Sequence, residues 1–441
     1  MDHYAKMRAS LAQRLPDGLI LLSGGTPIPR NNDVDYVFRQ KSDFLYLTGC
    51  EEPGCALLID PKRRKHTLFV PRIDNNHRVW LGHVPSTDEA KKIFGIDRVL
   101  YADELSKAVQ QAQSGYRRAY ADAEAAKKAK GALKLPNAAG ALRDALDELR
   151  ACKTAGELAL MRHANEITGA AHVEVMRRTR PGMKEYEIQA IFESECLKHG
   201  LKHLGYPSIV AAGKNGAVLH YHHNDAELKD GEMLLIDAGA EYKGYSADIT
   251  RCFPSNGRFT SRQRDVYNVV LDTQKACIDA ARPGIVSADL HVLSMTKIAE
   301  GLKSMGILNG ETSGLVEGGA VRLFYPHGLT HTLGLDVHDT LGGKKRKMPN
   351  PTKVPVRFVA KLEPGFVITM EPGVYFIDAL LNDAALRRKH KGSVDFEKAV
   401  TFLDFGGVRI EDDVVVQQDG PPLNLTCVPK EIADVEAACR R

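Results

Sequence analysis

The sequence predicts two domains, an α/β domain over residues 1–150 and an α+β domain over residues 151–441. Three observations predict this organisation: the length of 441 residues, a change of texture near residue 150, and a helix pattern that occurs twice after it. A single hydrophobic core seldom grows beyond ~250–300 residues, so a chain of this length divides into domains. Hydrophobic residues make up 43% and charged residues 26% of the chain, proportions typical of a globular protein.

The α/β domain is predicted from short apolar runs that alternate with helix-like stretches. Residues 18–22, 55–60 and 66–70 have the length and composition of buried strands, and residues 102–113 are helix-like. A polar zone rich in lysine and alanine and a further helix-like stretch at residues 138–149 complete this part. We therefore place the domain boundary near residue 150.

The α+β domain is predicted to repeat one helix arrangement. Thr154-Ala-Gly-Glu157 is a capping box that opens a helix, Arg180-Pro-Gly182 ends it, and a second helix follows at residues 185–199. A helix that begins at Ser261 likewise ends at Arg282-Pro-Gly284, again with a helix after it. Such a repeat predicts a pseudo-twofold domain in which helices cover a mostly antiparallel sheet. Chance is the alternative, because Pro-Gly commonly follows a helix.

Charge and cysteine content exclude several classes of protein. Sixty Lys and Arg against 56 Asp and Glu give a net charge of +4, which is too balanced to indicate a nucleic-acid or membrane partner. The basic run at residues 343–347 is interpreted as a solvated loop. We expect no export signal and no membrane-crossing helix. Eight cysteines without a Cys-x-x-Cys pair indicate reduced thiols, so we expect a soluble, cytoplasmic protein.

A predicted hairpin places two aspartates on one face. Residues 233–251 contain two strand-like runs around a polar turn. With the turn centred near Tyr242 and Lys243, Asp237 and Asp248 lie opposite one another. Facing ionised carboxylates destabilise a hairpin unless one takes up a proton or a cation lies between them. We interpret the pair as metal ligands; two solvent-facing aspartates are the alternative, which must explain why both lie in apolar runs.

Three histidines lie within a glycine-rich stretch of twelve residues, at His327, His331 and His338. A lone histidine is usually a satisfied core residue. Three of them, among small residues that allow close backbone approach, indicate one metal ligand with proton-transfer or oxyanion partners nearby. Histidines without a function remain the alternative for this stretch taken alone.

Two glutamates complete the candidate set. Glu371 ends a strand-like run and is followed by Pro-Gly, while Glu411 lies in a second such run in which it shares a face with Arg409. Taken singly, either glutamate could form a surface salt bridge.

Two aspartates, one histidine and two glutamates make a hard, oxygen-rich donor set with one nitrogen. This set suits manganese, cobalt, zinc or Fe(II) better than a thiolate-bound structural zinc. Four carboxylates balance two divalent ions, which together lower the pKa of a shared water until hydroxide forms near neutral pH. The donor set therefore predicts a hydrolytic two-metal site.

The chain resembles the pita-bread metallopeptidases. The resemblance is carried by five motifs in order: Leu-Leu-Ile-Asp237-Ala-Gly, Ser-Ala-Asp248-Ile-Thr-Arg251, His327-Gly-Leu-Thr-His331, Glu371-Pro-Gly373 and Gly407-Val-Arg409-Ile-Glu411. It implies a creatinase-like N-terminal domain, because residues 37–49 and Glu52-Pro-Gly54 are similar to the domain that prolidases and aminopeptidase P enzymes carry. It further implies that Asp237 and Asp248 hold one ion and His331 and Glu371 the other, with Asp248 and Glu411 bridging.

Within the family, the chain is more similar to prolidases than to aminopeptidase P. Residues 375–381, the insert before Gly406 and the ending at residues 425–429 carry this similarity. Arg357 matches the arginine with which prolidases bind the free carboxylate of a dipeptide; an ordinary exposed arginine is the alternative. The resemblance implies hydrolysis of Xaa-Pro dipeptides with manganese as the expected metal. Aminopeptidase P activity on longer peptides, or hydrolysis of organophosphorus esters at the same site, are the alternatives.

The resemblance implies further roles around the metals. His220 and His338 would stabilise the developing charge, and Glu371 would act as general base; we also expect Arg409 in catalysis and His327 in substrate binding. His222 and His223 are confusable neighbours of His220. Trp80, the single tryptophan, resembles an aromatic residue that enters the neighbouring subunit's pocket, which implies a homodimer; a plain core position is the alternative.

Overall fold

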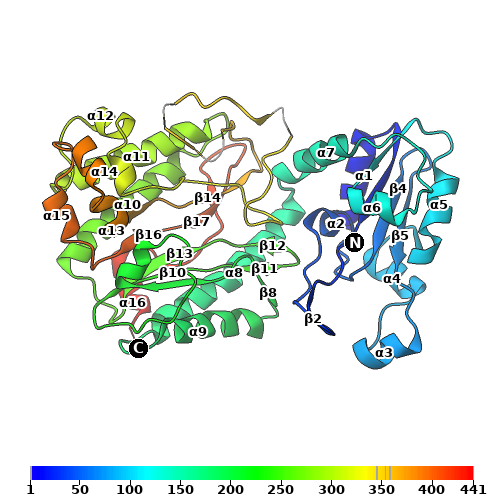
Figure 1. The fold of residues 1–441 in the computed structure, drawn as a ribbon, viewed down its shortest axis with the longest axis horizontal. Coiled ribbons are helices and arrows are strands. Elements are labelled where there is room, and N and C mark those ends of the chain that lie inside the picture. Colours follow the sequence, from blue (N-terminus) through cyan, green and yellow to red (C-terminus); the bar gives the residue numbers. More distant parts are fainter. Residues whose placement is uncertain (1, 344–345, 353, 357–358, 441) are drawn as a thin grey trace. The chain divides into compact units, whose positions relative to one another are not determined.

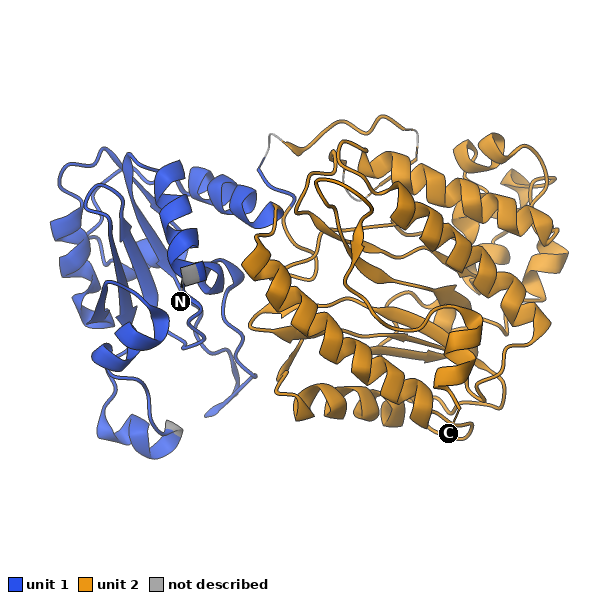
Figure 2. Cartoon of the chain, turned by 180° about the vertical axis from the view of Figure 1, so that it is seen from behind, with its two compact units in different colours: residues 1–151, 341–345 blue, residues 152–340, 346–441 orange. Residues whose placement is uncertain are grey.

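The computed structural model describes residues 2–343, 346–352, 354–356 and 359–440. The chain divides into two compact units, Met1–Ala151 with Leu341–Lys345, and Cys152–Thr340 with Arg346–Arg441 (Figure 2). The second unit therefore begins close to the texture change in the sequence. Each unit has its own hydrophobic core.

Unit 1 is built on a mixed five-stranded sheet of order β6-β5-β4-β1-β7 (Figure 1). Strand β1 pairs antiparallel with β4 and parallel with β7, and β5 pairs parallel with β6. Its strands are β1 Gly18–Ser23, β4 Ala56–Asp60, β5 Lys65–Val70, β6 Arg98–Tyr101 and β7 Arg118–Ala121, with a separate exposed hairpin of β2 Pro29–Asn31 and β3 Val34–Asp35. All of β1 and β4 is buried, as their unbroken apolar sequences predict.

Helices cover this sheet, and the predicted α/β class is confirmed. They are α1 Asp2–Arg14, α2 Ser42–Thr48, α3 Asn75–Leu81, α4 Thr87–Phe94, α5 Leu105–Ala112, α6 Ala123–Lys128 and α7 Ala139–Ala151, with the short helix η1 Ala102–Glu104. Leu105 and Val109 of α5 pack with Leu19 and Phe69 of the sheet in one apolar cluster.

Unit 2 contains the predicted pair of helix arrangements. Helix α8 (Ala155–Arg178) begins with the capping box of Thr154 and Glu157, and α9 (Glu185–Lys198) packs along it. Helix α10 (Ser261–Ala280) begins with a capping box as well, and α11 (Ser287–Ser304) packs along it. The left-handed backbone at Gly182 and Gly284, each with φ 86°, turns the chain between the two helices of each pair.

Short antiparallel strands follow each helix pair. After α9 come β8 His203–Leu204, β9 Ile209–Ala212, the short helix η2 Gly213–Ala217, β10 Met233–Asp237, β11 Ala240–Tyr242, β12 Tyr245–Ser246 and β13 Thr250–Pro254. After α11 come α12 Thr312–Glu317, η3 Val321–Leu323, β14 Val367–Met370, β15 Gly373–Tyr375, α13 Asp378–Leu381, α14 Ala384–Lys389, α15 Phe396–Val400, β16 Gly407–Arg409, β17 Asp412–Val415, β18 Leu423–Asn424 and α16 Ile432–Ala438. The predicted α+β class is confirmed.

The hairpin exists, but its predicted register is wrong by two residues. Asp237 pairs with Thr250 and not with Asp248. The two-residue turn is Lys243-Gly244, whose φ angles of 49° and 82° are both positive, as a tight I′-type hairpin turn requires. A shift of two residues keeps each side chain on its face, so both aspartates still point to the same side of the hairpin.

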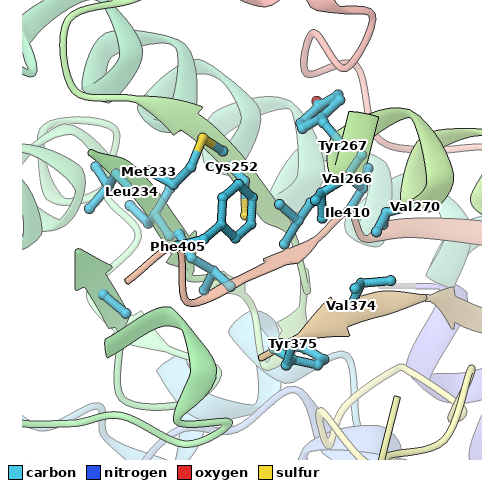
Figure 3. Packing of buried hydrophobic residues seen from close by; sticks show 14 of the residues in the cluster. Met233, Leu234, Cys252, Val266, Tyr267, Val270, Val374, Tyr375, Phe405 and Ile410 are labelled. Carbon is cyan, nitrogen blue, oxygen red and sulfur yellow. The ribbon is translucent and has the colours of Figure 1, made fainter. Parts of the chain in front are cut away.

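The core of unit 2 joins its two halves. Figure 3 shows side chains of β10, β13, α10 and β15 in one buried cluster, together with Phe405 and Ile410. An isolated bridge between Thr250 and Glu411 links the first hairpin to the strands of the second half. Among the described residues, no helix is long and apolar enough to cross a membrane.

A buried arginine, Arg251, holds the segment that contains Glu411 and Asp412. The Arg251 side chain is fully buried and donates hydrogen bonds to the carbonyl of Glu411 at 2.7 Å and to Asp412 Oδ1 at 2.6 Å. Lys430 Nζ lies 2.6 Å from the other oxygen of Asp412. Although burial disfavours the carboxylate, Arg251 and Lys430 lower the pKa of Asp412 to about 2. The pair thus holds the backbone directly after the Glu411 side chain.

Replacing Asp412 tests this arrangement. Asp412→Asn leaves the Arg251 guanidinium buried without its countercharge, so we expect the free energy of unfolding to fall by ~3–5 kcal/mol in denaturant titrations. Asp404→Asn is the matched control, because Asp404 pairs with Arg262 at an exposed site and its loss should cost no more than ~1 kcal/mol. Equal small effects of the two substitutions would contradict the role given to Arg251.

Candidate functional site

The five predicted metal ligands converge on one cavity in unit 2. Asp237 ends β10, Asp248 follows β12, His331 follows a coil segment, Glu371 follows β14 and Glu411 lies between β16 and β17. The cavity has a volume of about 370 Å³. Its lining includes these five side chains together with the predicted site residues His220, His327, His338 and Arg409.

The ligand candidates are close together and withdrawn from solvent. His331 Nε2 lies 3.4 Å from Asp248 Oδ2 and 3.6 Å from Glu371 Oε1. Ligand atoms of Asp248, His331 and Glu411 all lie within 4.8 Å of one another, close enough for one ion. One further carboxylate oxygen binds a protein donor: Asp237 Oδ2 accepts a hydrogen bond from Arg409 Nη2 at 2.6 Å.

A tyrosine hydroxyl shows that the carboxylates are short of positive charge. Tyr206 Oη lies 2.6 Å from Asp237 Oδ1 and 2.6 Å from Asp248 Oδ1. One hydroxyl hydrogen can serve only one of these two contacts at a time. The other Oδ1 atom therefore faces the hydroxyl oxygen with no hydrogen between them, unless that carboxylate carries a proton or binds a cation.

Burial and mutual repulsion shift the acidity of the cluster. Burial raises the pKa of Glu371 to about 7 and raises the pKa values of Asp248 and Glu411, whose negative charges also oppose one another. Burial works against a charged His331 ring, but Asp248 and Glu371 raise its pKa overall. Four carboxylates and one imidazole in such surroundings fit a pair of divalent cations, which supply the missing positive charge.

A directed chain of hydrogen bonds borders the ligands. Burial and the Arg409 charge lower the pKa of His327 to about 3, so its ring is neutral. Its Nδ1 lies 2.7 Å from the Gly328 carbonyl and must carry the hydrogen, which leaves Nε2 to accept from Tyr375 Oη at 2.8 Å. Arg409 Nη1 in turn donates to Tyr375 Oη at 2.9 Å. The chain orients Arg409 toward Asp237.

The other predicted histidines face the same cavity from two segments. The ring of His338 meets that of His331 edge-on at 4.3 Å between centroids. His220 is exposed and lies beside His222, with nearly parallel rings 6.4 Å apart. His220 and His338 both line the cavity, so either side chain can contact a molecule bound over the ligand candidates.

Of the remaining predicted residues, one lies in unit 1 and one is not among the described residues. Trp80 lies on α3 of unit 1 and is 76% exposed, so it is not a core residue of its own domain. Its place in an assembly stays a prediction. Arg357 lies outside the described residues, and its predicted contact with a substrate carboxylate also stays a prediction.

Several contributors were missed from the sequence. Tyr206 and Tyr375 carry no motif of their own, and their partners are distant in sequence. Thr250 is a third, because its hydroxyl donates to Glu411 Oε2 at 2.6 Å and accepts from Arg409 Nε at 3.1 Å. The strand period could have identified Thr250, since it shares a face with Asp248.

The sequence and the fold match known proteins over the entire chain. Residues 159–418 match the family model described as metallopeptidase family M24, and residues 4–120 match the aminopeptidase P N-terminal domain. The chain belongs to metallopeptidase family M24. The resemblance seen in the motifs is thereby confirmed at the level of the family and of its two-domain fold.

Similar members of this family carry two different names. A Homo sapiens Xaa-Pro dipeptidase is 37% identical over 458 residues, covering 98% of this chain and 92% of the relative. A probable Xaa-Pro aminopeptidase of Sordaria macrospora is 34% identical and covers 98% of this chain and 94% of the relative. The structure of zinc-substituted Escherichia coli aminopeptidase P in complex with product matches with a TM-score of 0.85 at 32% identity, over 100% of this chain and 99% of that one.

The bridging candidates are tested by substitution. Asp248→Ala or Glu411→Ala should remove at least one bound metal ion and reduce peptidase activity to background, with the fold retained. Asp279→Ala, at an exposed position of α10, is the control and should keep both. Metal content by mass spectrometry and the melting temperature decide the matter; a variant with two ions and full turnover would refute the assignment.

The acidity of the cluster predicts a pH-dependent effect of metal on stability. Because the pKa values of Asp248, Glu371, Glu411 and His331 are raised in the folded chain, the metal-free protein should lose stability as pH rises from ~4.5 through about 7. Metal ions replace these protons. The difference in melting temperature between metal-loaded and chelator-treated protein should therefore grow from pH 5 to pH 7.5, and a constant difference would count against a metal cluster.

Proposed function

We propose that the protein is a two-metal Xaa-Pro dipeptidase. The observation that carries the proposal is the convergence of four carboxylates and one imidazole on one cavity in a chain of a metallopeptidase family. The full-length similarity to a relative named Xaa-Pro dipeptidase supports the substrate class. We propose manganese as the native metal, a homodimer as the working unit and the cytoplasm as its location.

The proposed ligands divide between two ions. Asp237 and Asp248 would hold one ion, His331 and Glu371 the other, and Asp248 and Glu411 would be shared. When bound, two divalent ions polarise the scissile carbonyl and lower the pKa of an attacking water. Arg409 and Tyr206 keep the Asp237 carboxylate in place for this role.

The side chains around the ligands would serve the reaction itself. Glu371 would accept the proton of the attacking water and deliver it to the proline nitrogen. His220 and His338 would stabilise the negative charge that develops on the carbonyl oxygen. The nitrogen of an Xaa-Pro bond has no hydrogen, so a pocket without an acceptor at this point loses nothing with proline.

Aminopeptidase P activity on longer peptides is the second candidate. It is supported by the structural match to Escherichia coli aminopeptidase P and by relatives named Xaa-Pro aminopeptidase. The two activities differ in whether the substrate presents a free carboxylate directly after proline. We propose that Arg357 binds this carboxylate, which would favour dipeptides.

A substrate panel after metal reconstitution tests the proposal. The manganese-loaded protein should hydrolyse Ala-Pro and Gly-Pro faster than an Xaa-Pro tripeptide. Arg357→Ala should raise KM for dipeptides by about tenfold or more and leave Xaa-Pro amides nearly unchanged, since a charge-assisted contact is typically worth ~1.5–3 kcal/mol. Faster cleavage of the tripeptide would favour aminopeptidase P, and equal effects of the substitution on both substrates would refute the carboxylate contact.

The proposed shared pocket predicts a selective effect of Trp80. Because Trp80 is 76% exposed on α3, Trp80→Ala should keep the melting temperature and the dimeric mass but lower kcat/KM for dipeptides. Its neighbour Val79 is 80% exposed, so Val79→Ala is a matched control that should leave kcat/KM unchanged. An active wild-type monomer in light scattering at assay concentration, or equal activity of both variants, would contradict the shared pocket.

A further inference from the structure

A buried ion pair lies in unit 2, outside the proposed ligand set. Lys153 Nζ is 3.0 Å from Asp339 Oδ2, and both side chains are 1% exposed. Lys153 directly precedes the capping box of α8, whereas Asp339 directly follows His338. Both residues also lie close to the points where the chain passes between the two compact units, after Ala151 and after Thr340.

Asp339 closes the loop that separates the two histidines of the site. Its backbone N–H donates to the Thr332 carbonyl at 2.9 Å, and Thr332 Oγ1 donates to the Asp339 carbonyl at 2.5 Å. Thr332 directly follows His331, so these bonds bring the two ends of the loop together. The rings of His331 and His338 meet at these ends.

The space around the ion pair is fitted to it. A Cβ atom on Gly334 would lie 2.0 Å from Asp339 Oδ2 and 2.9 Å from Lys153 Cε, so only glycine leaves room for the pair inside the loop. The Gly334 carbonyl accepts a hydrogen bond from the N–H of Ser246 at 2.9 Å. Ser246 lies two residues before Asp248. The loop is thus tied to both the ion pair and the first hairpin.

Lys153 is anchored to the segment just before the strand that leads to another ligand candidate. Its backbone N–H donates to the Gly365 carbonyl at 2.7 Å, and the N–H of Leu333 donates to the Val367 carbonyl at 2.9 Å. Val367 begins β14, which ends directly before Glu371. The lysine and the histidine loop are therefore fixed to the same segment.

We propose that Lys153 and Asp339 are a positioning pair that holds His338 against His331 over the metal ligands. A buried ion pair is weak evidence for stability, because apolar residues of similar volume often replace one without loss. The ion pair matters here for its geometry. The Lys153 ammonium fixes the Asp339 carboxylate at the end of the loop, and the loop in turn fixes the rings of His331 and His338. The inference rests on the proposed function only for its activity readout.

The test compares substitutions that remove the charges with one that keeps them. Asp339→Asn and the double variant Lys153→Met/Asp339→Leu should bind manganese 10–100-fold more weakly in calorimetric titrations, the usual loss for a residue behind the ligands. Both should lower kcat with little change in KM. The double variant should keep the melting temperature of the metal-free protein, whereas Asp339→Asn should lower it, because the Lys153 ammonium stays buried without its countercharge. Lys153→Arg keeps the positive charge and should therefore retain much of the manganese affinity and of kcat. Lys297→Met/Glu300→Leu, at an exposed pair on α11, is the matched control.

The possible results separate the two proposals. Wild-type manganese affinity and kcat in Asp339→Asn and in a folded double variant would overturn the positioning role. If the double variant does not fold, Asp339→Asn alone decides, because it keeps the volume of the side chain. A wild-type protein that binds manganese but hydrolyses no Xaa-Pro peptide would refute the proposed function, while the affinities of the variants would still test the ion pair.

Discussion

The burial of four carboxylates in one cavity is the constraint on which the rest of the site depends. The carboxylates of Asp237, Asp248, Glu371 and Glu411 line it together, and burial and neighbouring negative charges raise the pKa values of Asp248, Glu371 and Glu411. Hydrogen-bond donors of the protein compensate only part of this negative charge. A pair of cations would supply the remainder, and carboxylates with raised pKa values in a cavity mark a candidate functional site.

The ligand candidates come from both halves of the α+β unit. Asp237 and Asp248 come from the first hairpin, whereas the other three ligand candidates come from the second half. The bridge between Thr250 and Glu411 joins the halves at the site itself. Ligands from both halves meet only when the entire unit is folded, so the geometry of the site is set by long-range packing and not by any one segment.

Strand periodicity and residue chemistry pointed to the two aspartates, whereas the family resemblance singled out His331 among the three histidines. Alternation places Asp237 and Asp248 on one face even though the hairpin register was predicted two residues out, because a shift of two preserves the face. The capping box at Thr154 similarly predicted the beginning of α8, and the helix predicted from Ser261 is α10. Local patterns of this kind are readable because each is decided within a few residues.

Partners that meet only in three dimensions could not be predicted. Tyr206 lies 31 and 42 residues from the two aspartates it contacts, and Lys153 lies 186 residues from Asp339. No local pattern distinguishes these residues from an ordinary tyrosine or lysine. Trp80 shows the converse limit: its exposure is visible in one chain, whereas its proposed role requires a second copy of the chain.

Anomalous diffraction from crystals of the manganese-loaded protein tests the central claim most directly. The account predicts two anomalous peaks in the cavity, one contacted by Asp237 and the other by His331 and Glu371, with Asp248 and Glu411 touching both. Peaks absent from the cavity at saturating manganese, or a single ion bound away from the carboxylates, would contradict it.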